Sequence, residues 1–308
     1  MAFGSAWARR LASVAATLME PPPGLDFDYS HPPGVPALVA ADSLSWRIFK
    51  NPVALFAGGV AAVILELAEP SVRSGVWDHS GFRCDPGLRL RRTGAAAMMT
   101  VYGPRPAAEA MIARVVALHE QVRGVNSAGR AYCANDQPLL DWVQATAAFG
   151  FIHAYHAYAA PLTRAERSRA FAEGTEAARL YGALGAPAAL GEWEALLART
   201  APSLERSPVI GEFLSIMRSA PILPLALRPL QRLMVSAAID LVPDELRGRL
   251  RLSRLGLSAP QRVLVRALGA LGERLPLDAA PAQACLRMGL PADWLYRGGS
   301  RALSADHF

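Results

Sequence analysis

The apolar residues of this chain recur with the spacing of helices, and no segment alternates convincingly with the period of two that marks a half-buried strand. Ala and Leu are abundant, and aromatic residues are only 7% of the 308 residues. This composition favours helices that pack closely through small side chains. We therefore predict an all-α fold and, because no clean linker divides the chain, one large helical domain.

Caps and prolines place the expected helices. Asn51 and Pro52 supply an N-cap and a first-turn proline, and they predict a helix that Pro70 stops. Gly58 and Gly59 lie inside this helix, where glycine costs stability, so another group is expected to approach the backbone closely. Further helices are expected over about 88–100, 106–123, 136–158, 163–182, 189–199, 203–218, 229–240, 243–251, 258–273 and 280–288.

The charge and the cysteines exclude several classes of protein. The net charge is +6, but Lys50 is the only lysine and the arginines are spread along the chain. Nucleic-acid binders usually gather basic residues on one face, so no nucleic-acid partner is predicted. The three cysteines, Cys84, Cys133 and Cys285, are too few and too scattered for a disulfide framework or a paired-cysteine metal site. They fit a reducing compartment.

The N-terminal segment bears on location. Arg9 and Arg10 precede a short apolar stretch, which resembles a twin-arginine export signal but lacks a small-residue cleavage site. We expect an amphipathic first helix and a cytoplasmic protein, with export as the alternative. The best candidate for a membrane span, Val53–Leu65, has 13 residues, fewer than the ~20 that a bilayer requires, and is interpreted as a buried core helix.

One histidine lies on an apolar face of the helix predicted over 106–123. Ala108, Ile112, Val115 and Val122 form a stripe with spacings of four, three, four and three that includes His119. A buried imidazole needs a partner for its ring nitrogens. Either His119 is a core residue hydrogen-bonded to a carbonyl or carboxylate, or it is an axial ligand of haem iron.

Three other histidines are candidate ligands. His153 and His156 are three residues apart on one predicted helix, which suits a metal, but no third ligand is spaced conveniently nearby. A packed or solvated helix face is the simpler interpretation of that pair. His79 lies in a separate segment.

Arg89, Arg92 and Thr93 share one helix face at i, i+3 and i+4. Two guanidinium groups and a hydroxyl on one side can bind carboxylates, such as haem propionates, or polarise a reacting oxygen. Taken alone, the segment also fits a surface turn of arginines paired with acidic residues.

Several short motifs then occur in order. They are Asp78-His79-Ser80-Gly81-Phe82, Asp85-Pro86, Arg89-Leu90-Arg91-Arg92-Thr93, His119-Glu120-Gln121-Val122-Arg123-Gly124, Tyr132-Cys133-Ala134-Asn135-Asp136, Leu140-Asp141-Trp142-Val143 and Pro243-Asp244-Glu245-Leu246-Arg247. Together they resemble the family of latex-clearing protein (rubber oxygenase) and the MpaB-like oxygenases. The resemblance covers residues 45–255, between an N-terminal helix with a proline-rich arm (1–44) and a helical extension of the same domain with a loose tail (256–308).

The resemblance implies a globin-like helical core that holds b-type haem. It also implies an oxygenase that acts with O2 on an apolar, unsaturated small molecule. By the family's motif His119 is the iron ligand, Arg89 and Thr93 match the motif's arginine and threonine, and Arg92 occupies its lysine position. Arginine does not readily lose its proton to coordinate iron, so an Arg92-gated or water-occupied distal side is expected, and polyisoprene is not the expected substrate.

The family's catalytic glutamate has no clear match, although Asp78 and His79 lie in the corresponding region. Two other classes of function stay open. One is a non-catalytic haem-binding or sensor protein. The other is a haem-free helical protein that carries a hydrophobic ligand or binds a partner, in which His119 is structural. A hydrolase or a nucleotide-dependent enzyme is not expected, because the corresponding motifs are missing.

Overall fold

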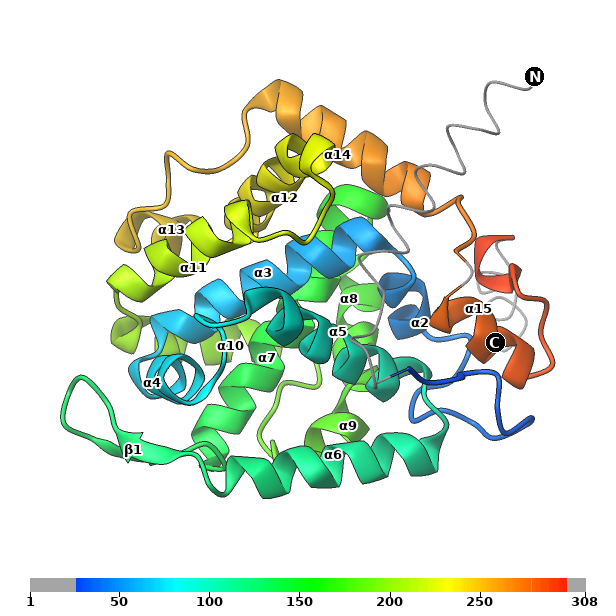
Figure 1. The fold of residues 1–308 in the computed structure, drawn as a ribbon, viewed down its shortest axis with the longest axis horizontal. Coiled ribbons are helices and arrows are strands. Elements are labelled where there is room, and N and C mark those ends of the chain that lie inside the picture. The colour runs from blue at the N-terminus through cyan, green and yellow to red at the C-terminus, as the bar shows by residue number, and fades with distance from the viewer. Residues whose placement is uncertain (1–25, 278, 298–308) are drawn as a thin grey trace.

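A computed structural model describes residues 26–277 and 279–297 and shows an all-α domain, as predicted (Figure 1). Its helices are α2 (Leu44–Phe49), α3 (Pro52–Ala68), α4 (Pro70–His79), α5 (Pro86–Tyr102), α6 (Arg105–His119), α7 (Gln137–Ala154), α8 (Arg164–Glu173), α9 (Thr175–Leu180), α10 (Leu190–Thr200), α11 (Pro208–Ser219), α12 (Arg228–Leu241), α13 (Asp244–Arg249), α14 (Ala259–Gly272) and α15 (Ala280–Arg287). The globin-like character of the core and the boundaries at residues 44 and 255 stay predictions. The expected N-terminal helix and the last residues of the tail lie outside the described residues.

Helices α3 and α7 cross at the centre of the domain, and α12 packs on the other side of α3 (Figure 1). At the crossing, a Cβ atom added to Gly58 would lie 2.7 Å from the carbonyl oxygen of Gly150. Only residues without a side chain allow so close an approach of two backbones. The close approach expected at the glycine pair is therefore confirmed at Gly58, whereas Gly59 faces the ring of Phe151 at 3.8 Å.

The buried apolar residues form two main clusters. The larger surrounds α3, α7, α11 and α12. The smaller joins the C-terminal half of α5 and the start of α6 to α2 and α15, through residues such as Tyr102, Ile112 and Cys285. Helix α5 packs chiefly on α2, α6 and α15. Helices α5 and α6 thus belong to a second layer beside the α3–α7 pair.

A single buried arginine joins the two ends of the described chain. The guanidinium of Arg287, on α15, donates hydrogen bonds to the carbonyl oxygens of Val35 (2.8 Å), Tyr29 (2.6 Å) and Tyr102 (2.6 Å). These bonds satisfy a charged group that is otherwise costly to bury. The proline-rich arm and α15 are therefore fixed against the C-terminal end of α5.

The chain departs from prediction at Pro70. Helix α3 ends at Ala68, but Pro70 begins α4 rather than ending helical structure. Glu69 is the N-cap of α4, and its carboxylate accepts a hydrogen bond from the backbone N–H of Val72 at 2.7 Å. Proline is well tolerated at the first position of a helix, so the same residue both stops α3 and permits a new axis, 111° from the first.

One short β-hairpin in this all-α domain was not predicted. β1 (Arg123–Val125) pairs antiparallel with β2 (Ala131–Cys133). Strands of three residues are too short for a period of two to be recognised. As a result α6 ends at His119 instead of near Arg123, and Val122 lies off the helix.

Three other predicted helices have different boundaries in the structure, and one helix was not predicted. The helix predicted over 136–158 is α-helical only to Ala154 and continues as a π-helical turn, Tyr155–Ala159. The helix predicted over 163–182 is divided at Gly174 into α8 and α9. Residues Ala201–Ser203 form a separate 3-10 turn before α11, and α2 was not predicted.

Within the described residues, no single helix is long and apolar enough to cross a membrane. The sharply bent pair α3 and α4 passes such a test only when the two are taken together. Most residues of α3 are buried in the core, as the interpretation of Val53–Leu65 predicts.

Candidate functional site

The central helix α3 has one face that solvent reaches. Leu55, Gly59, Val63 and Glu66 are partly exposed, whereas the residues between them on the other faces are buried, except Phe56. Their spacings of four, four and three place these four residues along one side of the helix. This side of α3 is therefore not filled by protein to the density of the rest of the core.

Helix α7 has a matching face. Val143, Ala147 and Phe151 are spaced by four and are partly exposed, and the Phe151 ring lies against Gly59. The two stripes contain mainly apolar side chains. Together they provide an apolar surface that is open to solvent beside α5, and apolar surfaces with a few polar groups are typical of small-molecule sites.

Helix α5 contributes a polar face to this region. The Arg89 Nη1 donates a hydrogen bond to the Thr93 hydroxyl at 2.6 Å, as their i, i+4 spacing predicts. Arg89 is half-buried, whereas Arg92 and Thr93 are exposed. Arg92 forms no ion pair or hydrogen bond with another described side chain, so its charge is available to an anion from outside the chain.

Glu66 is the acidic residue of this site, and it interacts with Arg89. The carboxyl of Glu66 accepts a hydrogen bond of 3.5 Å from the Thr146 hydroxyl on α7. Burial raises the pKa of Glu66 to about 7, and the nearby Arg89 charge and Thr146 reduce this rise only in part. Burial also lowers the pKa of Arg89, while Glu66 acts in the opposite direction. The carboxyl can therefore gain or lose a proton near neutral pH.

His119 is the last residue of α6 and is half-buried. Its Nδ1 atom is buried and has no hydrogen-bond partner among the described residues. Burial lowers the pKa of the imidazole, and the charge of Arg89 lowers it further. The ring is therefore neutral near pH 7, and a neutral imidazole is the form that binds a metal.

The position of His119 agrees with part of the predicted stripe. Ala108 and Ile112 on the same helix are fully buried, and Val115 is partly buried. The end of α6 is held by Asn135, whose side-chain amide donates to the Val116 carbonyl at 3.0 Å. The structure thus brings His119, Arg89, Thr93 and Glu66 to one region from three different helices.

Among the described residues, neither Asp78 nor His79 forms a hydrogen bond or ion pair with Glu66, Arg89, Thr93 or His119. Both are exposed at the C-terminal end of α4. Asp78 lies near Tyr132 of the hairpin, where its charge adds to the effect of burial in raising the pKa of that tyrosine. Their catalytic role stays a prediction, and the geometry favours Glu66 as the acidic group of the site.

Sequence reasoning missed Glu66, although a signal was present. It is the only charged residue in the 17 residues of α3. An isolated acid in an apolar helix must find a partner or remain protonated, so its presence alone marks a special position. What the sequence could not show is that α5 places Arg89 opposite it.

His153 and His156 occupy a different part of the core. His153 packs on Phe149, with 4.4 Å between ring centroids, and burial lowers its pKa to about 4. The Nδ1 of His156 accepts a hydrogen bond from the Leu162 backbone at 2.9 Å. Within residues 26–277 and 279–297, no group of three His, Cys, Asp or Glu residues is placed to hold a metal ion. That finding does not test His119, because haem iron needs only an axial ligand from the protein.

Comparison with known families decides what kind of domain this is. The family described as ER-bound oxygenase mpaB/B'/rubber oxygenase, catalytic domain, matches residues 46–274. The chain belongs to this family. The resemblance inferred from the short motifs is thereby confirmed, and membership supports oxygenase activity in general. No curated protein and no solved structure matches the chain.

Proposed function

We propose that this oxygenase-family protein binds b-type haem and oxidises an apolar, unsaturated small molecule with O2. The observation that carries the proposal is His119, a neutral, half-buried imidazole with a buried and unpartnered ring nitrogen beside Arg89. Leaving a buried polar atom without a partner costs roughly 1–3 kcal/mol. A group bound to the imidazole would offset this cost.

The side chains near His119 support a porphyrin as the ligand in this proposal. The open faces of α3 and α7 supply apolar surface for a flat ring, and exposed Arg92 offers a positive charge to a propionate. Haem bound there would supply the activation of O2. Arg92 would then anchor a propionate, Thr93 would hold the Arg89 guanidinium, and His119 would be the iron ligand.

Arg89 and Glu66 have a different role in this proposal. Because Arg89 interacts with Glu66 and donates to Thr93, its guanidinium is less available than that of Arg92 to bind a propionate. Arg89 instead holds positive charge at the site and keeps part of the Glu66 population ionised. With a pKa of about 7, the Glu66 carboxyl can accept a proton from the substrate or return one to the product.

The apolar faces favour a substrate without charge. Val63 on α3 and Val143, Ala147 and Phe151 on α7 offer no hydrogen-bonding side chain to a ligand. A polar substrate would lose water without gaining partners there. The substrate class that fits both this surface and an oxygenase is an otherwise apolar molecule with an electron-rich double bond.

Titration with haemin tests the proposal. The purified wild-type protein is expected to bind haemin with a sharp Soret band, and His119→Ala is expected to lose or shift that band. His153→Ala is the matched control, because His153 also has a buried Nδ1 without a partner but lies outside the site. Its Soret band should match the wild type. A wild-type protein that takes up no haemin would contradict the proposal.

Oxygen uptake then separates turnover from binding alone. In the presence of a reductant and apolar alkenes, the haem-loaded protein should consume O2 faster than Glu66→Gln loaded to the same extent. Equal, background rates for both would indicate haem binding without catalysis.

A further inference from the structure

Helix α14 exposes an apolar face on the outside of the molecule. Val263 is 68% exposed, Leu264 50% and Leu271 36%. Val265 and Gly269 on the opposite face are buried, and Gly269 lies against the π-helical turn after α7. The helix is therefore apolar on both sides, although only one side faces the core. A soluble helix normally has charged or polar residues on its outer face.

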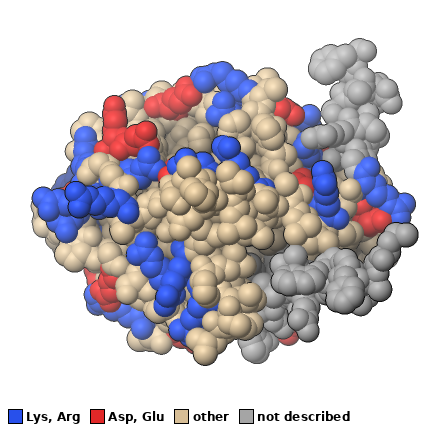
Figure 2. Space-filling view, turned by 90° about the horizontal axis from the view of Figure 1, so that it is seen from above, with Lys and Arg blue, Asp and Glu red and all other residues tan. Residues whose placement is uncertain are grey.

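Arginines border this outer face. Arg266 and Arg274 are exposed on α14 and just after its end, and Arg254 is exposed in the loop that leads into the helix. The Arg266 Nε also donates to the Ala157 carbonyl at 3.2 Å, which fixes its position at the edge of the stripe. Figure 1 places α14 at the top of the molecule, and Figure 2, which looks down on that side, shows a broad uncharged area with basic and some acidic side chains around it.

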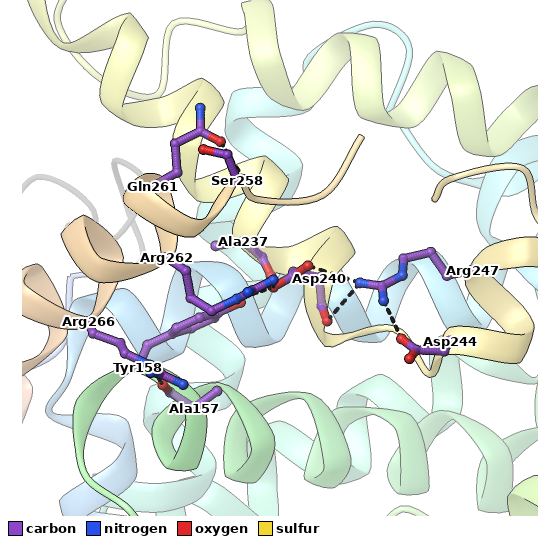
Figure 3. Close-up of polar contacts among 10 residues, drawn as sticks. All are labelled: Ala157, Tyr158, Ala237, Asp240, Asp244, Arg247, Ser258, Gln261, Arg262 and Arg266. Atoms are coloured by element: carbon purple, nitrogen blue, oxygen red, sulfur yellow. Dashed lines mark hydrogen bonds and ion pairs between the residues drawn. The ribbon is translucent and has the colours of Figure 1, made fainter. Parts of the chain in front are cut away.

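The acidic residues nearest to α14 do not cancel this charge. Asp240 lies between Arg247 and Arg262, with oxygen–nitrogen distances of 3.0 and 2.8 Å, and is largely buried (Figure 3). Glu273 follows α14 but turns inward to form an ion pair with Lys50 at 3.3 Å. The outer side of α14 therefore keeps an excess of positive charge over an apolar stripe.

We propose that the outer face of α14 docks the protein on an anionic phospholipid surface. An apolar stripe bordered by basic residues is the pattern of helices that lie in the membrane interface, with the apolar side chains entering the headgroup region and the arginines contacting lipid phosphates. A second copy of the chain is a poorer occupant, because it would bring the same arginines face to face. Nucleic acid would leave the apolar stripe without a partner. The inference does not depend on haem.

Vesicle sedimentation with the full-length protein tests this docking. The probes are vesicles of phosphatidylcholine alone and vesicles that also contain phosphatidylserine. Wild-type protein is expected to sediment with the anionic vesicles and to be released by high salt. The double variant Arg266→Gln/Arg274→Gln should bind roughly 30-fold more weakly, since each arginine near an anionic surface contributes roughly fivefold. The double variant Val263→Ser/Leu264→Ser should bind the anionic vesicles roughly tenfold more weakly, because its apolar area is smaller.

The matched control removes the same charge from the opposite side of the molecule. Arg114 on α6 and Arg130 in the hairpin are both exposed, and α6 lies at the bottom of Figure 1. Arg114→Gln/Arg130→Gln should change vesicle binding less than threefold. If both charge variants lost the same vesicle affinity, net charge alone would explain the binding, and the proposal would be overturned. The proposal would also be overturned if the wild-type protein did not bind anionic vesicles. The same holds if light scattering showed a wild-type dimer that the double variant Val263→Ser/Leu264→Ser dissociates.

Discussion

Two neighbouring faces of helix α3 are packed differently. On one side α3 and α7 meet backbone to backbone through Gly58 and Gly150, and no space is left even for a methyl group. On a neighbouring face Gly59, Val63 and Glu66 remain partly exposed, and α5 packs on other helices. The polar groups of the site, Glu66 and Arg89 among them, lie on this open side. Close packing is thus confined to one of the two faces, and the other is the face on which the proposed haem would lie.

The two hydrophobic clusters extend the same comparison. The larger cluster contains α3 and α7, and the smaller contains the C-terminal half of α5 and the start of α6. His119 at the end of α6 and Arg89 near the start of α5 lie beyond the well-packed part of the smaller cluster. A site between two rigid layers can hold a ligand without forming an opening in either core.

Substituting alanine for a glycine should change stability in opposite directions at the α3–α7 contact and on α5. Gly58→Ala places a methyl group against the Gly150 backbone and should lower the free energy of unfolding by roughly 3 kcal/mol. Gly94→Ala lies on α5, where a Cβ would meet nothing within 4 Å, and should raise the free energy of unfolding by up to roughly 1 kcal/mol. Urea denaturation of the haem-free proteins measures both. If both variants lost a similar free energy of unfolding, the two regions would not differ in packing as described.

Glu66 should make stability depend on pH. Its pKa is about 7 in the folded protein and ordinarily 4.5, so between these values the folded state holds a proton that the unfolded state has released. Wild-type stability should therefore fall as pH rises from about 5 to 7. Glu66→Gln lacks this loss and should be more stable than wild type by roughly 2 kcal/mol at pH 8, with little difference at pH 5. A constant difference across that range, in denaturation at each pH, would show that Glu66 is not held in this way.

The arginines of α5 should differ in their contribution to haemin affinity. Arg92→Gln removes an exposed charge at the proposed propionate site and should weaken haemin binding roughly two- to fivefold, less at high salt. Arg91→Gln is the control, because Arg91 lies 100° away around the helix from Arg92. An equal loss in both variants would argue against a specific contact at Arg92.

Local signals predicted most of the helices. The N-cap Asn51 accepts hydrogen bonds from the Val53 and Ala54 backbones, and Thr163 with Glu166 forms a complete capping box. These contacts lie within one turn, so the sequence contains all their partners. Pro70 shows the limit of this reasoning, because a proline that stops one helix and a proline that starts the next have the same sequence signal.

The site was predicted only in part, because its contacts join distant segments. The Arg89–Thr93 pair lies within one turn of α5 and followed from spacing. The neighbourhood of Glu66, Arg89 and Thr146 depends on how α3, α5 and α7 pack, which no local pattern specifies. For His119, helical spacing placed the residue on the correct face, but its position at the end of α6 depends on the hairpin that follows.

Chemical rescue tests the role of His119 most directly. His119→Gly removes the imidazole and leaves space for a free one at the same position. The account predicts that this variant loaded with haemin has an altered Soret band, and that added imidazole restores the wild-type spectrum in a saturable way. A His119→Gly protein whose haemin spectrum equals the wild type without imidazole would show that another residue holds the iron, and would contradict the account.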